Sequence, residues 1–363
     1  MAQTRTVAHG WINRLAASRR FQDLCARLPG LRSIARAEGA AIFDLMAGFV
    51  RSQTLAALVE LRVMHRLAEG PASTTALAAT TRIPVERMQV LVQAGAAIKL
   101  LRRLRDGRYA LARRGAAFLG VPGLEMLVHH HAVLYRDLSD PAAFFRGDTD
   151  PDLAHFWPYV FGAGAARDPE IATRYSKLMA DTQALVAQDT LDAVPWLRGQ
   201  QHLVDIGGGT GAFLRAVHSR YPDLRLSLFD LPAVVAAAAL PQAITRLAGS
   251  FRDDPLPKGA DTLSLIRVCY DHNDTTVAAL LRACAEALPQ GGRLILSEPM
   301  SGDTRPDPQT DVYFAVYTLA MGSGKTRTTA QLSSLVSAAG FDRIRGPMSH
   351  RPYVTRTLSA TRT

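Results

Sequence analysis

A glycine-rich turn between an apolar run and an amphipathic helix is the feature that most restricts the fold of this chain. Residues 203–206 are apolar apart from Asp205, Gly207–Gly211 contains four glycines, and residues 212–221 have helical spacing. Glycines let the backbone turn tightly and approach a ligand closely. This order is typical of a strand, turn and helix in a parallel α/β sheet.

The residues after this turn alternate between strand and helix patterns. Strands are predicted at 224–230, 244–251, 261–270 and 292–300, with helices at 231–240 and 275–288. Strands that alternate with helices indicate βαβ units around a parallel sheet. We therefore expect an α/β domain with a parallel sheet over residues 196–363.

The first half of the chain has the periodicity of helices instead. Residues 41–69 have apolar residues at helical spacing, and shorter helices are predicted at 74–81 and 85–101. Asp106-Gly107 then separates two short strands, which is a strong hairpin signal. Three helices and a hairpin predict a winged-helix-like arrangement, and residues 124–195 again read as helical.

The length of the chain agrees with two domains. Its 363 residues are about twice an ordinary domain, and the pattern changes near residues 195–201. We predict a helical, winged-helix-like domain at 1–195 and the α/β domain at 196–363.

Cysteine usage and hydropathy exclude several classes of protein. The three cysteines, Cys25, Cys269 and Cys284, lie far apart without a Cys-x-x-Cys motif, so neither a metal site nor a disulfide framework is expected. The chain has no run of about 18 uncharged apolar residues and no signal-peptide core at its start. We expect a cytoplasmic protein in a reducing compartment.

Positive charge is concentrated in two segments. Residues 1–40 hold seven arginines against two acidic residues, and residues 91–115 hold seven basic residues against Asp106 alone. Such segments favour an anionic partner, either nucleic acid or lipid headgroups. An arginine-rich surface without a partner fits them equally well.

Two ligands fit the glycine-rich turn. Gly207, Gly209 and Ala212 match the Gly-x-Gly-x-x-Ala fingerprint of dinucleotide sites, and Asp230 ends the next strand where a ribose-binding acid belongs. However, Asp205 just ahead of the turn disfavours a pyrophosphate and favours a cationic ligand. S-adenosylmethionine (SAM), with a sulfonium, an ammonium and a ribose, is therefore the predicted cofactor. NAD binding and a purely structural turn are the alternatives.

Several later stretches carry a resemblance to a known family. LFDLPAVV, AGSF, LPKGAD, RVCYDHND and GGRLILSEPM occur in that order. In them the chain resembles, over nearly its whole length, the SAM-dependent O-methyltransferases of the plant caffeate and animal acetylserotonin type. The resemblance implies a winged-helix-like dimerisation domain, a Rossmann-like catalytic domain and a homodimer.

The same resemblance, together with the turn, predicts the residues that bind the cofactor. Phe251 would stack on the adenine, and Ser250 departs from the acid that is usual at its position. The predicted set is Asp205, Gly207, Gly208, Gly209, Gly211, Asp230, Leu231, Gly249, Ser250, Phe251 and Arg267.

Two stretches of sequence point to one subgroup within this family. RVCYDHND at 267–274 and YFAVYTLAMGSGKTRT at 313–328 resemble bacterial carotenoid O-methyltransferases, which methylate the tertiary hydroxyl of hydroxylated acyclic carotenoids such as demethylspheroidene. The alternatives are an O-methyltransferase of an aromatic polyketide or another small molecule, a bacteriochlorophyllide C-methyltransferase, and a winged-helix DNA-binding regulator.

The catalytic position departs from the phenol-methylating members of the family. Their His-Asp-Trp stretch corresponds to Tyr270-Asp271-His272, and of their two framing carboxylates Glu298 is kept while Thr326 replaces the other. Tyr270 is expected to orient the acceptor hydroxyl or simply to pack against the cofactor. A tertiary alcohol loses its proton late in the transfer, to Asp271, Glu298 or water. His272 fits the lost tryptophan better than a displaced base.

Two aromatic segments are candidates for the wall of a pocket for a hydrophobic substrate, although each fits core packing as well. The candidates are Phe156, Trp157, Tyr159, Phe161, Met179, Tyr313, Phe314 and Tyr317.

The composition of the N-terminal segment suggests where in the cell the protein works. Residues 1–38 set Trp11, Ile12 and other large apolar residues among the arginines. This pattern suits the headgroup region of an anionic membrane, or a dimer interface alone. No nucleic-acid partner is expected.

Overall fold

The computed structural model describes residues 10–156, 182–351 and 354–363. They belong to two compact units, residues 1–120 and 121–363. The predicted boundary lies at 195 and 196 instead, so residues 121–195 fall in the second unit although they were expected to belong with the first.

The first unit begins with a series of helices. Residues 10–16 are helical, and they are followed by α2 (Arg19–Arg27), α3 (Pro29–Met46), α4 (Gly48–Glu60) and α5 (Val63–Glu69). The single helix predicted over 41–69 is therefore wrong. The chain breaks at Ala47, and again before α5, where Arg62 takes a left-handed φ of 55°.

The rest of the first unit has the predicted winged-helix order. It comprises α6 (Thr74–Thr81), α7 (Val85–Ala97), β1 (Leu101–Arg103), β2 (Tyr109–Leu111) and α8 (Arg113–Leu119). Ser73 caps α6 by accepting a hydrogen bond from the Ala76 N–H. The hairpin around Asp106-Gly107 is confirmed, since β1 and β2 pair antiparallel with Leu101 opposite Leu111.

None of the described helices is long and apolar enough to cross a membrane by itself. The pair α3 and α4, bent by 54° at their break, meets the length and composition test when taken together.

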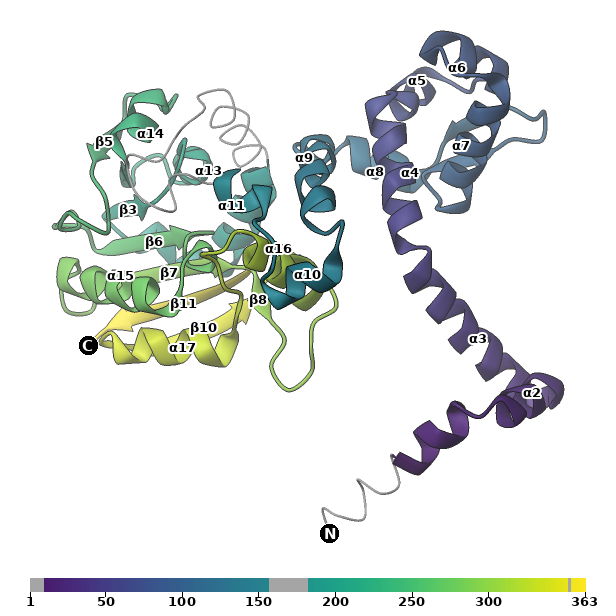
Figure 1. Cartoon of the computed structure of the whole chain (residues 1–363). Helices are drawn as coiled ribbons and strands as arrows, with labels where there is room; N and C mark the ends of the chain where they lie inside the picture. The colour runs from purple at the N-terminus through teal and green to yellow at the C-terminus, as the bar shows by residue number, and fades with distance from the viewer. Residues whose placement is uncertain (1–9, 157–181, 352–353) are drawn as a thin grey trace. The chain divides into compact units, whose positions relative to one another are not determined.

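The second unit is built on a seven-stranded sheet (Figure 1). The order of its strands is β10-β11-β7-β6-β3-β4-β5. Five of them run parallel to their neighbours, namely β3 (His202–Ile206), β4 (Arg225–Asp230), β5 (Ile244–Ala248), β6 (Thr262–Ile266) and β7 (Arg293–Glu298). At one edge β11 (Arg356–Arg362) and β10 (Phe341–Met348) are antiparallel.

Helices cover both faces of this sheet. One apolar core joins it to α15 (Asp274–Ala287) and α17 (Thr329–Ala338), and the other joins it to residues 182–193, α13 (Ala212–Arg220) and α14 (Pro232–Ala237). Successive strand residues alternate between the two cores, as in a sheet buried on both sides. The predicted α/β class, with a helical domain ahead of it, is confirmed.

Shorter elements complete the second unit. These are α9 (Leu124–Asp137), α10 (Pro141–Arg146), α11 (Asp152–Phe156), η2 (Pro195–Gly199), η3 (Cys269–Asp271), β8 (Met300–Ser301), η4 (Thr310–Phe314), α16 (Ala315–Ala320) and β9 (Arg327–Thr328). A third apolar cluster joins α9, α10, α11, η4 and α16. Because the parallel strands all end at one edge of the sheet, the loops that follow them meet there.

Candidate active site

The glycine-rich turn lies between β3 and α13, where the sequence predicts it. Gly207, Gly209 and Gly211 have φ values of 67°, 59° and 76°, a left-handed region that glycine adopts without the steric cost of a side chain. A β-carbon at position 208 would lie 2.4 Å from Asp205 Oδ2. The backbone of the turn therefore rests directly on this carboxyl group.

Asp205 is buried beneath the turn with an incomplete set of hydrogen bonds. Ser264 Oγ donates to Asp205 Oδ1 at 2.6 Å, whereas Oδ2 has no partner among the described residues. Burial raises the pKa of Asp205 to about 7. A buried acceptor without a partner is costly, and a cationic ligand above the turn would relieve that cost.

Asp230 closes the same side of the site from the end of β4. Its Oδ2 accepts the Gly209 N–H at 2.7 Å, and its Oδ1 accepts the Leu231 N–H at 2.7 Å. Each oxygen keeps a second lone pair, so the carboxylate can still accept two hydroxyl groups. Two free acceptor positions are what the two hydroxyls of a ribose need.

The loop after β5 places three more predicted residues beside Asp230. The Gly249 N–H donates to the Asp230 carbonyl at 2.9 Å. Ser250 is bound within its own turn, because its N–H donates to Asp254 Oδ2 and its Oγ donates to Asp253 Oδ2, each at 2.8 Å. Ser250 replaces the acid expected at its position, and Asp253 and Asp254, three and four residues later in the chain, bond to it.

Phe251 and His272 form the far wall of this loop. Their rings meet edge to face at 5.3 Å, and Arg252 Nη2 lies 3.1 Å from His272 Nδ1. Burial and the nearby arginines lower the pKa of His272 to about 3. The imidazole is therefore neutral, and its Nδ1 is occupied by a guanidinium donor. His272 lies with the cofactor loop, which agrees with its interpretation as something other than a base.

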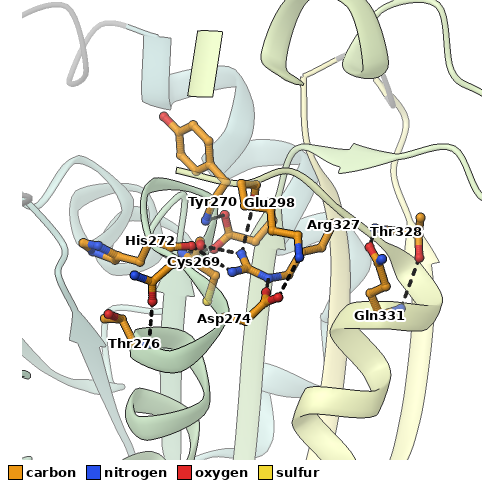
Figure 2. A network of polar contacts seen from close by, with 11 residues as sticks. Cys269, Tyr270, His272, Asp274, Thr276, Glu298, Arg327, Thr328 and Gln331 are labelled. Atoms are coloured by element: carbon orange, nitrogen blue, oxygen red, sulfur yellow. Dashed lines mark hydrogen bonds and ion pairs between the residues drawn. The ribbon is translucent and has the colours of Figure 1, made fainter. Parts of the chain in front are cut away.

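Two side chains, Glu298 and Arg327, hold the backbone of the segment 268–272 (Figure 2). Glu298 accepts the N–H groups of Val268, Cys269 and Tyr270 at 3.1, 2.8 and 3.2 Å. Arg327 donates to the carbonyls of Cys269 and His272, each at 2.8 Å. Glu298 thus acts on this segment through its backbone.

Arg327 was not predicted from the sequence, although it lies next to Thr326. It is 3% exposed, and its Nε donates to Asp274 Oδ1 at 2.8 Å. The space between this network and its neighbours is about 10 Å³, which is too small for a ligand. The network is therefore a support for the site rather than part of its cavity.

Tyr270 and Asp271 lie on this supported segment and are both buried. The Tyr270 ring points away from the Glu298–Arg327 network in Figure 2, and its edge meets Phe314 of η4 at 6.4 Å. Burial and the charge of Glu298 raise the pKa of Asp271 well above its ordinary value. Asp271 Oδ1 has no hydrogen-bond partner among the described residues.

Arg267 links the end of β6 to the neighbouring helix. Its backbone takes a φ of 59°, and its Nη1 donates to Thr182 Oγ1 at 3.0 Å. A hydrogen bond from Arg267 also opposes the rise in the Tyr270 pKa that burial causes. The guanidinium therefore contacts both the helix that carries Thr182 and Tyr270.

The predicted pocket wall is described only in part. Trp157, Tyr159, Phe161 and Met179 lie outside the described residues, and for Phe156 only the backbone is described, at the end of α11. Tyr313 and Tyr317 are described, and their rings stack at 6.0 Å. In the described ranges, no group of three His, Cys, Asp or Glu side chains is placed to hold a metal ion.

Comparison with known proteins agrees with this geometry. Residues 135–342 match the O-methyltransferase domain, and residues 43–120 match the O-methyltransferase dimerisation domain. The chain is 56% identical to the demethylspheroidene O-methyltransferase of Cereibacter sphaeroides, over 96% of this chain and 94% of that protein. It is 50% identical to the protein of the same name from Rhodobacter capsulatus, over 97% and 89%.

A solved structure shares the fold of most of the chain. Human N-acetylserotonin methyltransferase in complex with SAM superposes with a TM-score of 0.78 at 25% identity. The match covers 90% of this chain and 97% of that one. The likeness therefore extends over the helical and the α/β parts together.

Proposed function

The chain belongs to the O-methyltransferase family and uses SAM as its methyl donor, and from this premise we propose that its acceptor is the tertiary hydroxyl of a hydroxylated acyclic carotenoid of the demethylspheroidene type. The observation that carries the proposal is the 56% identity, over 96% of the chain, to a demethylspheroidene O-methyltransferase. Tyr270 in place of the family's histidine also supports an acceptor other than a phenol.

When bound, SAM supplies a methyl group activated by the positive charge of its sulfonium. We propose that Asp230 holds the ribose hydroxyls, that Phe251 covers the adenine, and that Asp205 balances the positive charge. The other contacts are assigned to Gly207, Gly208, Gly209, Gly211, Leu231, Gly249, Ser250 and Arg267. The acceptor without a partner at Asp205 and the spare lone pairs of Asp230 support this assignment.

The residues of the predicted catalytic set receive separate roles in this proposal. Tyr270 orients the acceptor hydroxyl, and Asp271 sets the electrostatic environment of Tyr270. Glu298 positions the segment that carries both, because its oxygens accept three backbone N–H groups. His272 packs against Phe251 and shapes the cofactor loop. Holding donor and acceptor in line accounts for up to about 7–11 kcal/mol of the barrier in such reactions.

The protein acts as a homodimer, which the dimerisation-domain match over residues 43–120 supports. We propose further that the cytoplasmic protein visits the surface of an anionic membrane to reach its water-insoluble substrate. Trp11, Ile12 and Ile34 are 61%, 55% and 60% exposed among the arginines of the first helices. An exposed apolar face flanked by basic residues suits the headgroup region.

Methyl transfer from labelled SAM to a panel of acceptors tests the proposed function. The panel contains a hydroxylated acyclic carotenoid, the same carotenoid without its hydroxyl, a bacteriochlorophyllide and a phenol. We expect transfer to the hydroxylated carotenoid alone, with a methyl ether as the product. Transfer to the phenol or to a chlorophyllide carbon, and none to the carotenoid, would assign the chain to one of the alternative acceptors instead.

A further inference from the structure

Two histidines of α9 meet two tyrosines of η4 and α16 within the second unit. His131 Nε2 lies 2.8 Å from Tyr313 Oη, and His130 Nε2 lies 2.7 Å from Tyr317 Oη. Tyr313 is in a π-helical turn, a local geometry that occurs frequently at functional sites. The two pairs are neighbours, since the tyrosine rings stack.

A chain of ring contacts joins the His131–Tyr313 pair to Tyr270. The Tyr313 ring meets Phe314 edge to face at 5.1 Å, and Phe314 in turn meets Tyr270. Arg267, which bonds to the Tyr270 hydroxyl, also lies close enough to Tyr313 to oppose the rise in its pKa. The charge of one guanidinium therefore acts on both phenol groups. Tyr313 and Tyr317 both pack in the apolar cluster of α9, α10, α11, η4 and α16, and Tyr313 is the one whose ring meets Phe314.

The protonation states of this pair suit a proton acceptor. Burial lowers the pKa of His131, so its imidazole is neutral at physiological pH. Burial raises the pKa of Tyr313, so the phenol keeps its proton and can donate it to His131 Nε2. The Tyr313 oxygen still has a lone pair with which to accept a second hydrogen bond.

We propose that Tyr313 and His131 carry away the proton of the acceptor hydroxyl, in place of the histidine base that is absent at position 270. This inference rests on the proposed function, because it requires an alcohol as acceptor. The bond between the alcohol oxygen and the methyl carbon forms as the sulfonium–methyl bond breaks, with its electron pair going to sulfur. The hydroxyl proton passes to Tyr313 Oη, while the proton of Tyr313 passes to His131 Nε2.

Atoms and charge balance in this step. The products are a methyl ether, S-adenosylhomocysteine and an imidazolium at His131, which now carries the positive charge that the sulfonium loses. An alcohol whose oxygen is gaining a methyl group becomes strongly acidic, so a weak base in hydrogen-bond contact suffices. The imidazolium then releases its proton to solvent, which half-buried His131 can reach.

The other candidate acceptors are less suitable. The Glu298 oxygens accept three N–H groups, and His272 Nδ1 faces Arg252. The raised pKa of Asp271 favours its protonated form, which is the wrong state for an acceptor. Tyr313 and His131 remain the pair whose geometry and protonation both agree with the task.

The test compares single-turnover methyl transfer in the wild type, Tyr313→Phe and His131→Asn, with His129→Asn as the matched control. His129 is on the same helix and exposed. We expect both substitutions of the pair to slow transfer by about 100-fold, the lower end for general acid–base catalysis. SAM affinity by calorimetry should stay within about twofold, as expected for groups that act on the acceptor. The rate of His129→Asn should equal the wild-type rate.

Two further measurements separate proton transfer from a packing role. The wild type should show a solvent deuterium isotope effect on the transfer step, and Tyr313→Phe should lose it. Histidine ¹⁵N spectra should show His131 Nε2 as an unprotonated acceptor whose shift moves in Tyr313→Phe. A protonated Nε2 in the wild type would overturn the proposal without any activity assay.

The failure of the inference differs from the failure of the proposed function. If the wild type does not methylate any hydroxylated carotenoid, the proposed acceptor is wrong, and the variants are compared on whichever alcohol the wild type methylates. If Tyr313→Phe transfers at the wild-type rate, the Tyr313–His131 path is wrong and the proposed function stands.

Discussion

Asp230 makes contacts that only a carboxylate with spare lone pairs can make. Its two oxygens accept the Gly209 and Leu231 N–H groups, and in the proposed complex they also accept the ribose hydroxyls. Asp230→Ala should weaken SAM binding by about 1.5–3 kcal/mol, the range for hydrogen bonds to a charged group. Calorimetry measures the loss. Asp223→Ala, in the exposed loop before β4, is the matched control, and an unchanged affinity in Asp230→Ala would remove Asp230 from the site.

Asp205 predicts a dependence of SAM affinity on pH. Burial raises the pKa of Asp205 to about 7 in the free protein, and a cation beside it would lower that pKa. Binding should then release protons near pH 7, and affinity should rise from pH 6 to pH 8 by at most about tenfold per pH unit, the linkage limit for one group. Calorimetry in buffers of different ionisation enthalpy counts the protons.

The raised pKa of Asp205 also predicts how the free energy of unfolding changes with pH. Between about pH 4 and pH 7 the unfolded chain has lost the Asp205 proton while the folded chain keeps it, so this group lowers the free energy of unfolding as pH rises. Asp205→Asn should remove both the proton release and this part of the pH dependence. Equal proton release by wild type and Asp205→Asn would show that another carboxyl titrates.

At the scale of single residues, the sequence predicted best those positions that depend on their neighbours in the chain. The glycines and Asp230 stand next to a strand end, so their roles follow from local spacing. The pairs His131–Tyr313 and His130–Tyr317 join residues far apart in the chain. No local sequence pattern predicts contacts between residues so far apart, and the two pairs were missed for that reason. Arg327 was missed because its partners are two backbone carbonyls and Asp274, which lies far from it in the chain.

Among the elements, the segment 268–272 depends most on long-range support. Arg327→Met would leave the buried carbonyls of Cys269 and His272 without their donor. We expect the free energy of unfolding to fall by about 2–3 kcal/mol, as for hydrogen bonds to a charged group. Urea unfolding measures it, with Arg305→Met on an exposed loop as the control. If the two variants are equally stable, Arg327 does not support this segment.

The elements also show where sequence patterns give reliable predictions. The alternating strands and helices from β3 to β7 were predicted, because strands buried on both faces have short apolar runs. β10 was not, since it is a largely exposed edge strand whose residues FDRIRGPM lack alternation. The breaks at Ala47 and Arg62 were missed because neither residue is a typical helix breaker, and the adjacent Gly48 reads as a tolerated helix residue.

For the whole molecule, the exposed apolar residues around the break between α3 and α4 predict where two copies meet. Leu45, Phe43 and Phe49 are 84%, 65% and 69% exposed, and all three lie within the matched dimerisation domain. Leu45→Glu should raise the dissociation constant of the dimer by about 100-fold, because an unpaired carboxylate is costly to bury. Sedimentation velocity at micromolar concentration measures it. Gln53→Glu on α4 adds the same charge as a control, and a fully dimeric Leu45→Glu would place the interface elsewhere.

Membrane attachment is also a property of the whole molecule. Full-length protein should float with phosphatidylglycerol vesicles at low salt and not with neutral vesicles, since each basic residue near an anionic surface contributes about 1 kcal/mol. Deleting residues 1–38 should abolish flotation and leave SAM affinity unchanged. Full-length protein that never floats would mean that the carotenoid reaches the enzyme by another route.

Glu298 and Arg327 fix the segment 268–272 through its backbone, and this affects how such an enzyme can diversify. Both side chains grip peptide groups, and the Tyr270 side chain points away from them. The conformation of the loop therefore does not depend on which side chain stands at position 270. A lineage can exchange histidine for tyrosine there without rebuilding the loop that presents it.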